Sequence, residues 1–144
     1  MIFSGLRIAT LLSVLFPLAA VACASIDITD AWIREPPPSS NVAAGYFSAI
    51  NNGSEEQIIT RIKSSCCASV SMHKTSIEDG RARMHHLDTL TLAPTKKVNF
   101  APNGAHLMLI GPVVPIRSSE VVEINFFCLD GTSTPIDFKV LRTN

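Results

Sequence analysis

The chain has 144 residues and a formal net charge of zero, with 12 basic and 12 acidic side chains. This length is typical of a single domain that can bury a hydrophobic core without several disulfides. The sequence contains no basic run or stripe, so its composition does not indicate nucleic-acid binding.

The N-terminal segment predicts export. Arg7 precedes an apolar run that is too short to span a bilayer comfortably and is followed by small residues. Both Ala20-Val21-Ala22 and Ala22-Cys23-Ala24 fit an A-x-A cleavage site. We favour cleavage after Ala24, which gives a signal peptide over residues 1–24 and one periplasmic domain over residues 25–144. A lipoprotein anchored through Cys23 is the alternative, although Ala20 stands where such signals usually have leucine.

Export places the cysteines in an oxidising compartment, where disulfides form. If cleavage follows Ala24, three cysteines remain: Cys66, Cys67 and Cys128. An odd number predicts at least one unpaired thiol or an intermolecular bond. Our hypothesis is a bridge from Cys66 to Cys128, with Cys67 as the competing partner.

Short segments of alternating apolar and polar residues follow one another along the chain. The first runs from Ser25 to Arg34 and ends at a proline-rich loop over residues 35–40. Turn residues separate the later segments, including Ile77 to Gly80 and Gly111-Pro112. Many short strands without helical periodicity predict an all-β fold, either a Greek-key sandwich or a barrel. The other predicted strands are Val42–Asn51, Gln57–Ser64, Ser69–Thr75, Arg81–His86, Leu90–Leu92, Val98–Phe100, His106–Ile110, Val121–Phe127 and Ile136–Leu141.

Candidate metal ligands are concentrated between Met72 and Met108. This window holds all four histidines of the chain and every methionine except Met1. Histidine and methionine are the neutral side chains that bind soft metal ions. Because side chains alternate along a strand, His106 and Met108 point the same way, roughly 7 Å apart along the chain. One metal ion can bridge that gap.

The order His73, ten residues, Met84, twenty-one residues, His106-x-Met108 resembles the signature of the periplasmic copper chaperone family written PCu(A)C. The resemblance covers nearly the whole mature chain and implies a cupredoxin-like fold, in agreement with the strand pattern. It extends to Ala31-Trp32-Ile33-Arg34 with Pro36-Pro37-Pro38, to Ala43-Ala44-Gly45-Tyr46-Phe47, and to Asn103-Gly104-Ala105-His106-Leu107-Met108-Leu109.

This resemblance implies that one Cu(I) ion is bound by the imidazoles of His73 and His106 and the thioethers of Met84 and Met108. Such neutral, soft donors favour Cu(I) over hard cations, which prefer carboxylates. The implied function is to carry Cu(I) in the periplasm and to deliver it to a cuproprotein. The acceptor is typically the CuA centre in subunit II of cytochrome c oxidase, or a copper-relay protein. We therefore expect a monomer that meets the membrane only through a membrane-bound acceptor.

The remaining histidines and methionine of the window lie outside the family pattern. Met72 is opposite in phase to His73 and is expected in the core. Alternation puts His86 on the face of Met84, where it would be an auxiliary or Cu(II) ligand; an exposed polar edge is the preferred interpretation of His85 and His86. The C-terminus at residues 141–144 has no His or Met, so we do not expect a tail-borne second copper site.

Two alternatives to a chaperone follow from the same residues. A blue-copper electron carrier needs a cysteine thiolate with histidines and a methionine nearby, but no His or Met follows Cys128. A metal-free β-sandwich binding or adhesion module of the cell envelope would use Met84 and Met108 for packing alone. An enzyme is least supported, because the sequence has no G-x-S-x-G elbow and no paired-carboxylate arrangement.

Overall fold

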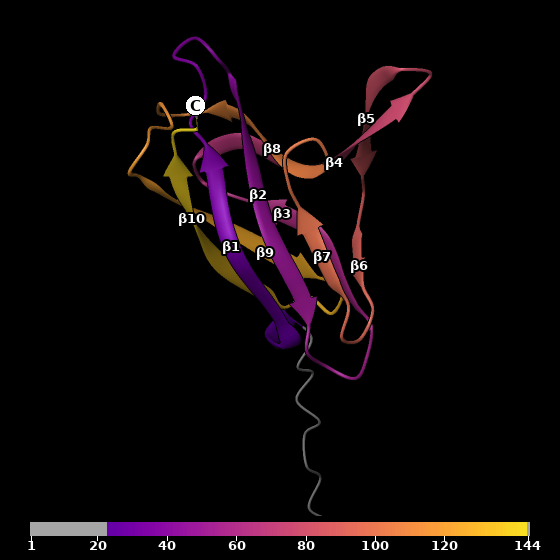
Figure 1. The fold of residues 1–144 in the computed structure, drawn as a ribbon. Helices are drawn as coiled ribbons and strands as arrows, with labels where there is room; N and C mark the ends of the chain where they lie inside the picture. Colours follow the sequence, from indigo (N-terminus) through magenta and orange to yellow (C-terminus); the bar gives the residue numbers. More distant parts are fainter. Residues whose placement is uncertain (1–22, 144) are drawn as a thin grey trace, which may run out of the picture.

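The computed structural model describes residues 23–143, so the predicted signal peptide lies outside the described residues except at its last two positions. A 3-10 helix, η1 (Cys23–Ser25), precedes ten strands (Figure 1). No helix in residues 23–143 is long and apolar enough to cross a membrane. The strands are β1 (Ile26–Arg34), β2 (Val42–Asn51), β3 (Gln57–Lys63), β4 (Cys67–Glu78), β5 (Arg81–Leu87), β6 (Leu90–Leu92), β7 (Lys97–Phe100), β8 (Ala105–Pro112), β9 (Val121–Cys128) and β10 (Ser133–Leu141).

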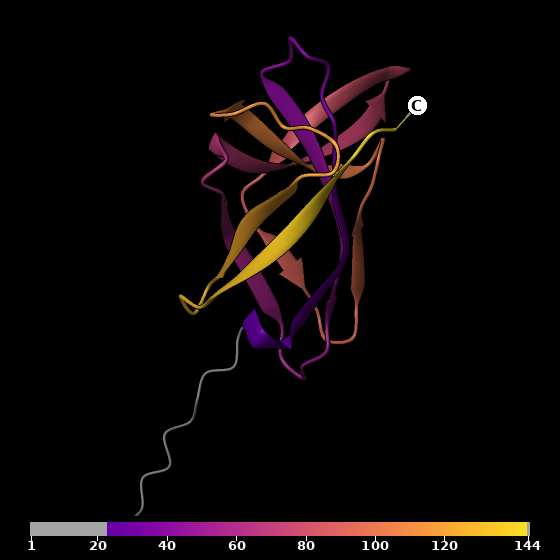
Figure 2. The ribbon, with the colours of Figure 1, turned by 90° about the vertical axis from the view of Figure 1, so that its left-hand side faces the viewer.

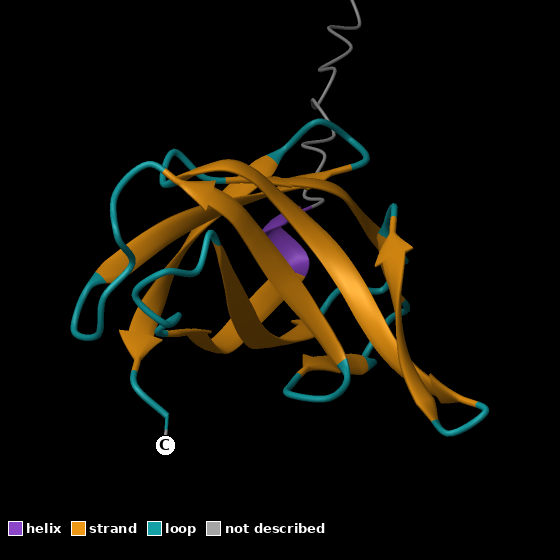
Figure 3. Ribbon diagram, turned by 90° about the horizontal axis from the view of Figure 1, so that it is seen from above, coloured by secondary structure: helices purple, strands orange, loops and turns teal. Residues whose placement is uncertain are grey.

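All ten strands belong to one sheet, in the order β5-β4-β8-β7-β2-β1-β10-β9-β3-β6, with a further pairing of β8 with β2. Most pairs are antiparallel; β1 with β10 and β7 with β8 are parallel. The sheet curls around its own interior, as the view from above shows (Figure 3). This architecture confirms the predicted all-β fold.

Phe47 occupies the centre of the core. Its side chain is 1% exposed, and its ring stacks on Phe100 with ring centres 4.4 Å apart. It also meets Phe126 edge-on at 5.2 Å and Phe138 at 6.1 Å. These four rings come from β2, β7, β9 and β10, so burial of aromatic surface draws distant strands of the sheet together.

The predicted strand positions agree with the structure, but two predicted turns were wrong. Ile77 and Glu78 belong to β4, because they pair with Ala82 and Arg81. The turn is only Asp79-Gly80, whose φ angles of 51° and 74° suit a two-residue hairpin loop of the I′ type. Gly111 and Pro112 likewise do not form a turn. They are the last two residues of β8, and Pro112 pairs with Cys67.

The hairpin of β4 and β5 projects from the body of the molecule (Figure 1). Six of the seven residues of β5 are exposed, and β5 forms one edge of the sheet. The view turned by 90° shows the hairpin near the end of the molecule that carries the C-terminus, with η1 at the opposite end (Figure 2). Side chains on this hairpin are therefore accessible to solvent.

The cysteine hypothesis was wrong. Cys128 is bonded to Cys23, and Cys66 is bonded to its neighbour Cys67, so no cysteine of residues 23–143 is free. Cys128 ends β9 beside η1, where the Cys23 amide donates to the Thr132 hydroxyl at 3.0 Å. The odd count of cysteines applied to a chain cleaved after Ala24, whereas the described residues include Cys23.

We predict that the two disulfides contribute unequally to stability. The Cys23–Cys128 bridge has a sequence separation of 105 residues, whereas Cys66–Cys67 joins neighbours and restricts little of the unfolded chain. The double variant Cys23→Ser, Cys128→Ser should lose roughly 2–5 kcal/mol of unfolding free energy in urea without reductant. The matched double variant Cys66→Ser, Cys67→Ser should lose much less. Equal losses would contradict this prediction.

Candidate metal centre

Three histidines lie side by side on neighbouring strands where the projecting hairpin joins the body. His86 of β5 stands opposite His73 of β4, and His73 stands opposite His106 of β8. The ring centres of His73 and His86 are 5.1 Å apart, and those of His73 and His106 are 6.0 Å apart. We call His86, His73 and His106 the histidine row.

The two predicted methionine ligands lie on the same face as the histidine row but on opposite sides of it. Met84 pairs with Thr75, and Met108 pairs with Ser71. Each methionine is thus a diagonal neighbour of His73, about 7–8 Å away between Cα atoms. Met84 is 54% exposed. The fold brings His73, Met84, His106 and Met108 to one face, with the methionines approaching from two directions.

A backbone hydrogen bond sets the tautomer of the His106 ring. The ring is 8% exposed, and its Nδ1 donates a hydrogen bond of 3.1 Å to the carbonyl of Gly104. Because a carbonyl only accepts, Nδ1 carries the proton, and Nε2 of the neutral ring keeps its lone pair. The same carbonyl accepts from the Thr75 amide at 3.1 Å, which ties this support to β4. A second partner of this kind orients metal-binding imidazoles.

His73 lies in the middle of the histidine row and stays neutral more readily than a free histidine. Burial is the main cause that lowers the pKa of His73, and repulsion from the charged forms of His86 and His106 adds to it. A neutral imidazole has a lone pair for a metal ion, whereas an imidazolium does not. Nε2 of His73 shares a hydrogen bond of 2.9 Å with the Ser71 hydroxyl. A metal ion at this nitrogen would replace that contact.

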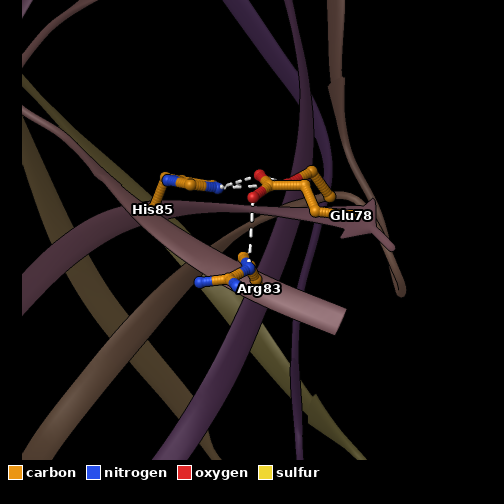
Figure 4. Close-up of polar contacts among 4 residues, drawn as sticks. Glu78, Arg83 and His85 are labelled. Carbon is orange, nitrogen blue, oxygen red and sulfur yellow. Dashed lines mark hydrogen bonds and ion pairs between the residues drawn. The ribbon is translucent and has the colours of Figure 1, made fainter. Parts of the chain in front are cut away.

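His85 lies on the other face of the hairpin and is separate from the histidine row. Figure 4 shows the Glu78 carboxylate between His85 and Arg83. Nε2 of His85 is 2.8 Å from one carboxylate oxygen, and Nε of Arg83 is 3.2 Å from the other. Met72 also faces away from the row; it is 3% exposed and pairs with Leu107, which confirms its predicted place in the core.

The histidine row is aligned rather than convergent. No group of three or more His, Cys, Asp or Glu side chains within residues 23–143 is already arranged to hold a metal ion. The rings of His73 and His106 are stacked with an interplanar angle of 21°, so side-chain rotation must turn their nitrogens toward one point. The donors that share this face are imidazoles and thioethers, which suit copper better than hard cations.

Two supporting groups escaped the sequence analysis, the Ser71 hydroxyl and the Gly104 carbonyl. Each belongs to the residue two positions before a row histidine. A residue two positions before a histidine lies on the same face of a strand. This spacing was the sequence signal that could have identified the two supporting groups. Sequence spacing alone did not show that β4 lies between β5 and β8, which makes these groups neighbours of the site.

A protein-family model described as "Putative lipoprotein LpqE-like" matches residues 26–140. One relative is "Putative lipoprotein Lxx21020" of Leifsonia xyli subsp. xyli, which is 24% identical over 112 residues. That alignment covers 77% of this chain and 66% of the relative, so the chain spans slightly less than two thirds of that protein.

Two solved structures share the fold. The copper-bound PCuAC domain from PmoF2 superposes with a TM-score of 0.70 at 22% identity, covering 83% of this chain and 94% of that domain. The solution structure of Cu(I)-DR1885 from Deinococcus radiodurans gives 0.64 at 23% identity, covering 78% of this chain and 76% of that protein. These matches confirm the predicted cupredoxin-like fold.

Proposed function

Because the chain belongs to the LpqE-like family and has the fold of PCuAC domains, we propose that it is a copper chaperone of the cell envelope. This membership agrees with the resemblance to the PCu(A)C family found in the sequence. The proposed cargo is one Cu(I) ion, bound by His73, Met84, His106 and Met108.

The observation that carries this proposal is the register of β4 and β8. It places His73 opposite His106 on the face that Met84 and Met108 share. His106, whose Nδ1 donates to Gly104, and His73, whose pKa is lowered by burial, offer nitrogen lone pairs. The two thioethers add soft, uncharged donors. A site of neutral ligands holds a monovalent ion without burying uncompensated anions. Thioether bonds to copper are also labile enough for exchange with the ligands of an acceptor.

The cysteines give no support to a blue-copper electron carrier. Such a site needs a thiolate, and every cysteine of residues 23–143 is in a disulfide. A metal-free binding or adhesion module remains the competing function. It differs in one respect that can be measured, because it requires no copper affinity from the methionines.

Anaerobic titration with Cu(I) against a chromophoric chelator tests the binding site. We expect one equivalent to bind to the wild-type protein, and affinity to fall about 10-fold or more for each ligand removed in the double variant Met84→Leu, Met108→Leu. The matched control is Met72→Leu, which changes a buried methionine on the opposite face. Unchanged affinity in the double variant would remove the His2Met2 site, and no binding by the wild type would favour the metal-free module.

Delivery to an acceptor is the second part of the proposal. The accepting protein would be subunit II of cytochrome c oxidase, through its CuA centre, or a copper-relay protein. We expect Cu(I)-loaded chaperone mixed with the apo CuA domain to transfer copper, measured as metal content after the two proteins are separated. In a contrary result, the chaperone loses copper readily to a small chelator and yet retains it in the presence of the apo CuA domain. That result would exclude this acceptor.

We also propose that the chain is exported and that the mature protein begins at Cys23. Cleavage after Ala24, as first expected, would discard Cys23 and leave the buried Cys128 without its partner. Cleavage after Ala22, the other A-x-A fit, keeps the bridge. The lipoprotein descriptions of the family favour a lipid on the Cys23 sulfur. Such a lipid would prevent the Cys23–Cys128 bridge, as cleavage after Ala24 would.

Intact mass of the protein from the envelope fraction distinguishes these outcomes. We expect a chain that starts at Cys23 and carries two disulfides, each seen as a gain of two hydrogens on reduction. A start at Ser25 would contradict the proposal, and so would a mass increased by acyl groups on Cys23.

A further inference from the structure

We propose that the disulfide between Cys66 and Cys67 is a redox-active site, which accepts two electrons from a protein dithiol by thiol–disulfide exchange. The site is separate from the candidate metal centre. Cys67 begins β4, and His73 follows six residues later, which is about 20 Å along an extended strand. The inference therefore does not depend on the chaperone proposal.

The first argument is that the fold encloses the two disulfides differently. Cys23 and Cys128 are each 3% exposed, and both belong to the buried core. Cys67 is also buried, at 8% exposed, but Cys66 lies partly exposed in the turn before β4. A thiolate from solution can therefore approach the bond at Cys66, whereas the core covers the Cys23–Cys128 bridge. Accessible disulfides are the ones that take part in exchange.

The second argument is that the turn is held without the disulfide. The Cys66 carbonyl accepts from the Val113 amide at 2.8 Å, and the Cys66 amide donates to the Ser64 hydroxyl at 3.3 Å. Cys67 pairs with Pro112 of β8. The Cα atoms of the two cysteines are 3.8 Å apart, the spacing of any neighbours joined by a trans peptide bond. The bond can therefore open and close while its backbone stays in place and the thiols stay adjacent.

The difference in exposure sets the order of the exchange steps. A donor thiolate attacks the Cys66 sulfur, the disulfide breaks, and its electron pair passes to the Cys67 sulfur, which takes up a proton. The second donor thiolate then attacks the donor sulfur of the mixed disulfide, and Cys66 leaves as a thiolate and takes up the second proton. The donor dithiol is oxidised to a disulfide, and the cysteine pair is reduced to two thiols.

The surface beside Cys66 indicates that the donor is a protein. Val113, whose amide contacts the Cys66 carbonyl, is 71% exposed, and Val114 is 62% exposed. Covering two exposed apolar side chains stabilises a complex with another protein surface, whereas a small thiol is too small to cover them. We call Val113 and Val114 the valine pair.

The first test is reduction of the folded mature protein by dithiothreitol, followed by alkylation and mass analysis of tryptic peptides. Residues 64–74 form one tryptic peptide that contains both Cys66 and Cys67. We expect this peptide to be alkylated at about 10-fold lower dithiothreitol than the peptides of Cys23 and Cys128. Circular dichroism should show that the protein stays folded during the reaction.

Two matched variants test the direction of attack. Cys67→Ser leaves the thiol of Cys66, and Cys66→Ser leaves the thiol of Cys67. Because Cys66 is the more exposed, we expect Cys67→Ser to react with an aromatic disulfide reagent about 10-fold faster than Cys66→Ser. Thermal unfolding establishes that both variants are folded.

The donor is tested with reduced thioredoxin as the protein dithiol and dithiothreitol as the small one. The double variant Val113→Ser, Val114→Ser keeps the backbone of the turn and removes the valine pair. We expect it to slow reduction by thioredoxin about 10-fold and to leave reduction by dithiothreitol unchanged. An unchanged rate with thioredoxin would overturn the assignment of a protein donor.

Three further results would overturn the redox site itself. These are two free thiols at Cys66 and Cys67 in the air-oxidised protein, reduction of Cys23–Cys128 at the same dithiothreitol concentration, or reduction of Cys66–Cys67 only after unfolding. Cu(I) titration of the double variant Cys66→Ser, Cys67→Ser separates this proposal from the proposed function. We expect its copper affinity to equal that of the wild type, so failure of the redox site would leave the chaperone proposal standing.

Discussion

The register of β4 between β5 and β8 is the constraint on which the candidate site depends. Met72 of β4 pairs with Leu107 in the core, and His73, the next residue, pairs with His106 on the outer face. A slip of one residue would exchange these faces and bury His73 in place of Met72. The cost of burying an imidazole in an apolar core therefore holds the histidine row in place.

The two sides of the candidate site differ in burial, because β8 lies in the body of the sheet and β5 lies at its edge. The rings around Phe47 join β2 and β7 to β9 and β10, so aromatic packing holds the curled sheet around its interior. The hairpin of β4 and β5 has no such partner, and β5 is almost wholly exposed. His106 is thus fixed by burial and by the Gly104 carbonyl, while Met84 and His86 stand on a solvated edge. The candidate ligand Met84 is therefore far more accessible to solvent than the candidate ligand His106.

The two methionines flank His73 on the face that carries the histidine row. Thioethers approach His73 from opposite sides, and the third imidazole lies directly across from it. Imidazoles and thioethers are therefore neighbours on one face, and both are neutral donors that suit copper. This arrangement comes from strand pairing.

Several features of the protein could be derived from its sequence because they depend on local pattern. Alternating apolar residues and turn residues predicted the ten strands and the all-β class. The resemblance of the spacing of His73, Met84, His106 and Met108 to the PCu(A)C pattern implied the four candidate ligands. The burial of Met72 followed from its phase. Other features depend on which strands become neighbours, which no local pattern encodes. The position of β4 between β5 and β8 brought His106 opposite His73, and the end of β9 beside η1 decided that Cys128 bonds to Cys23 rather than to Cys66. Those contacts join residues far apart in the chain, so only burial of the common core determines them.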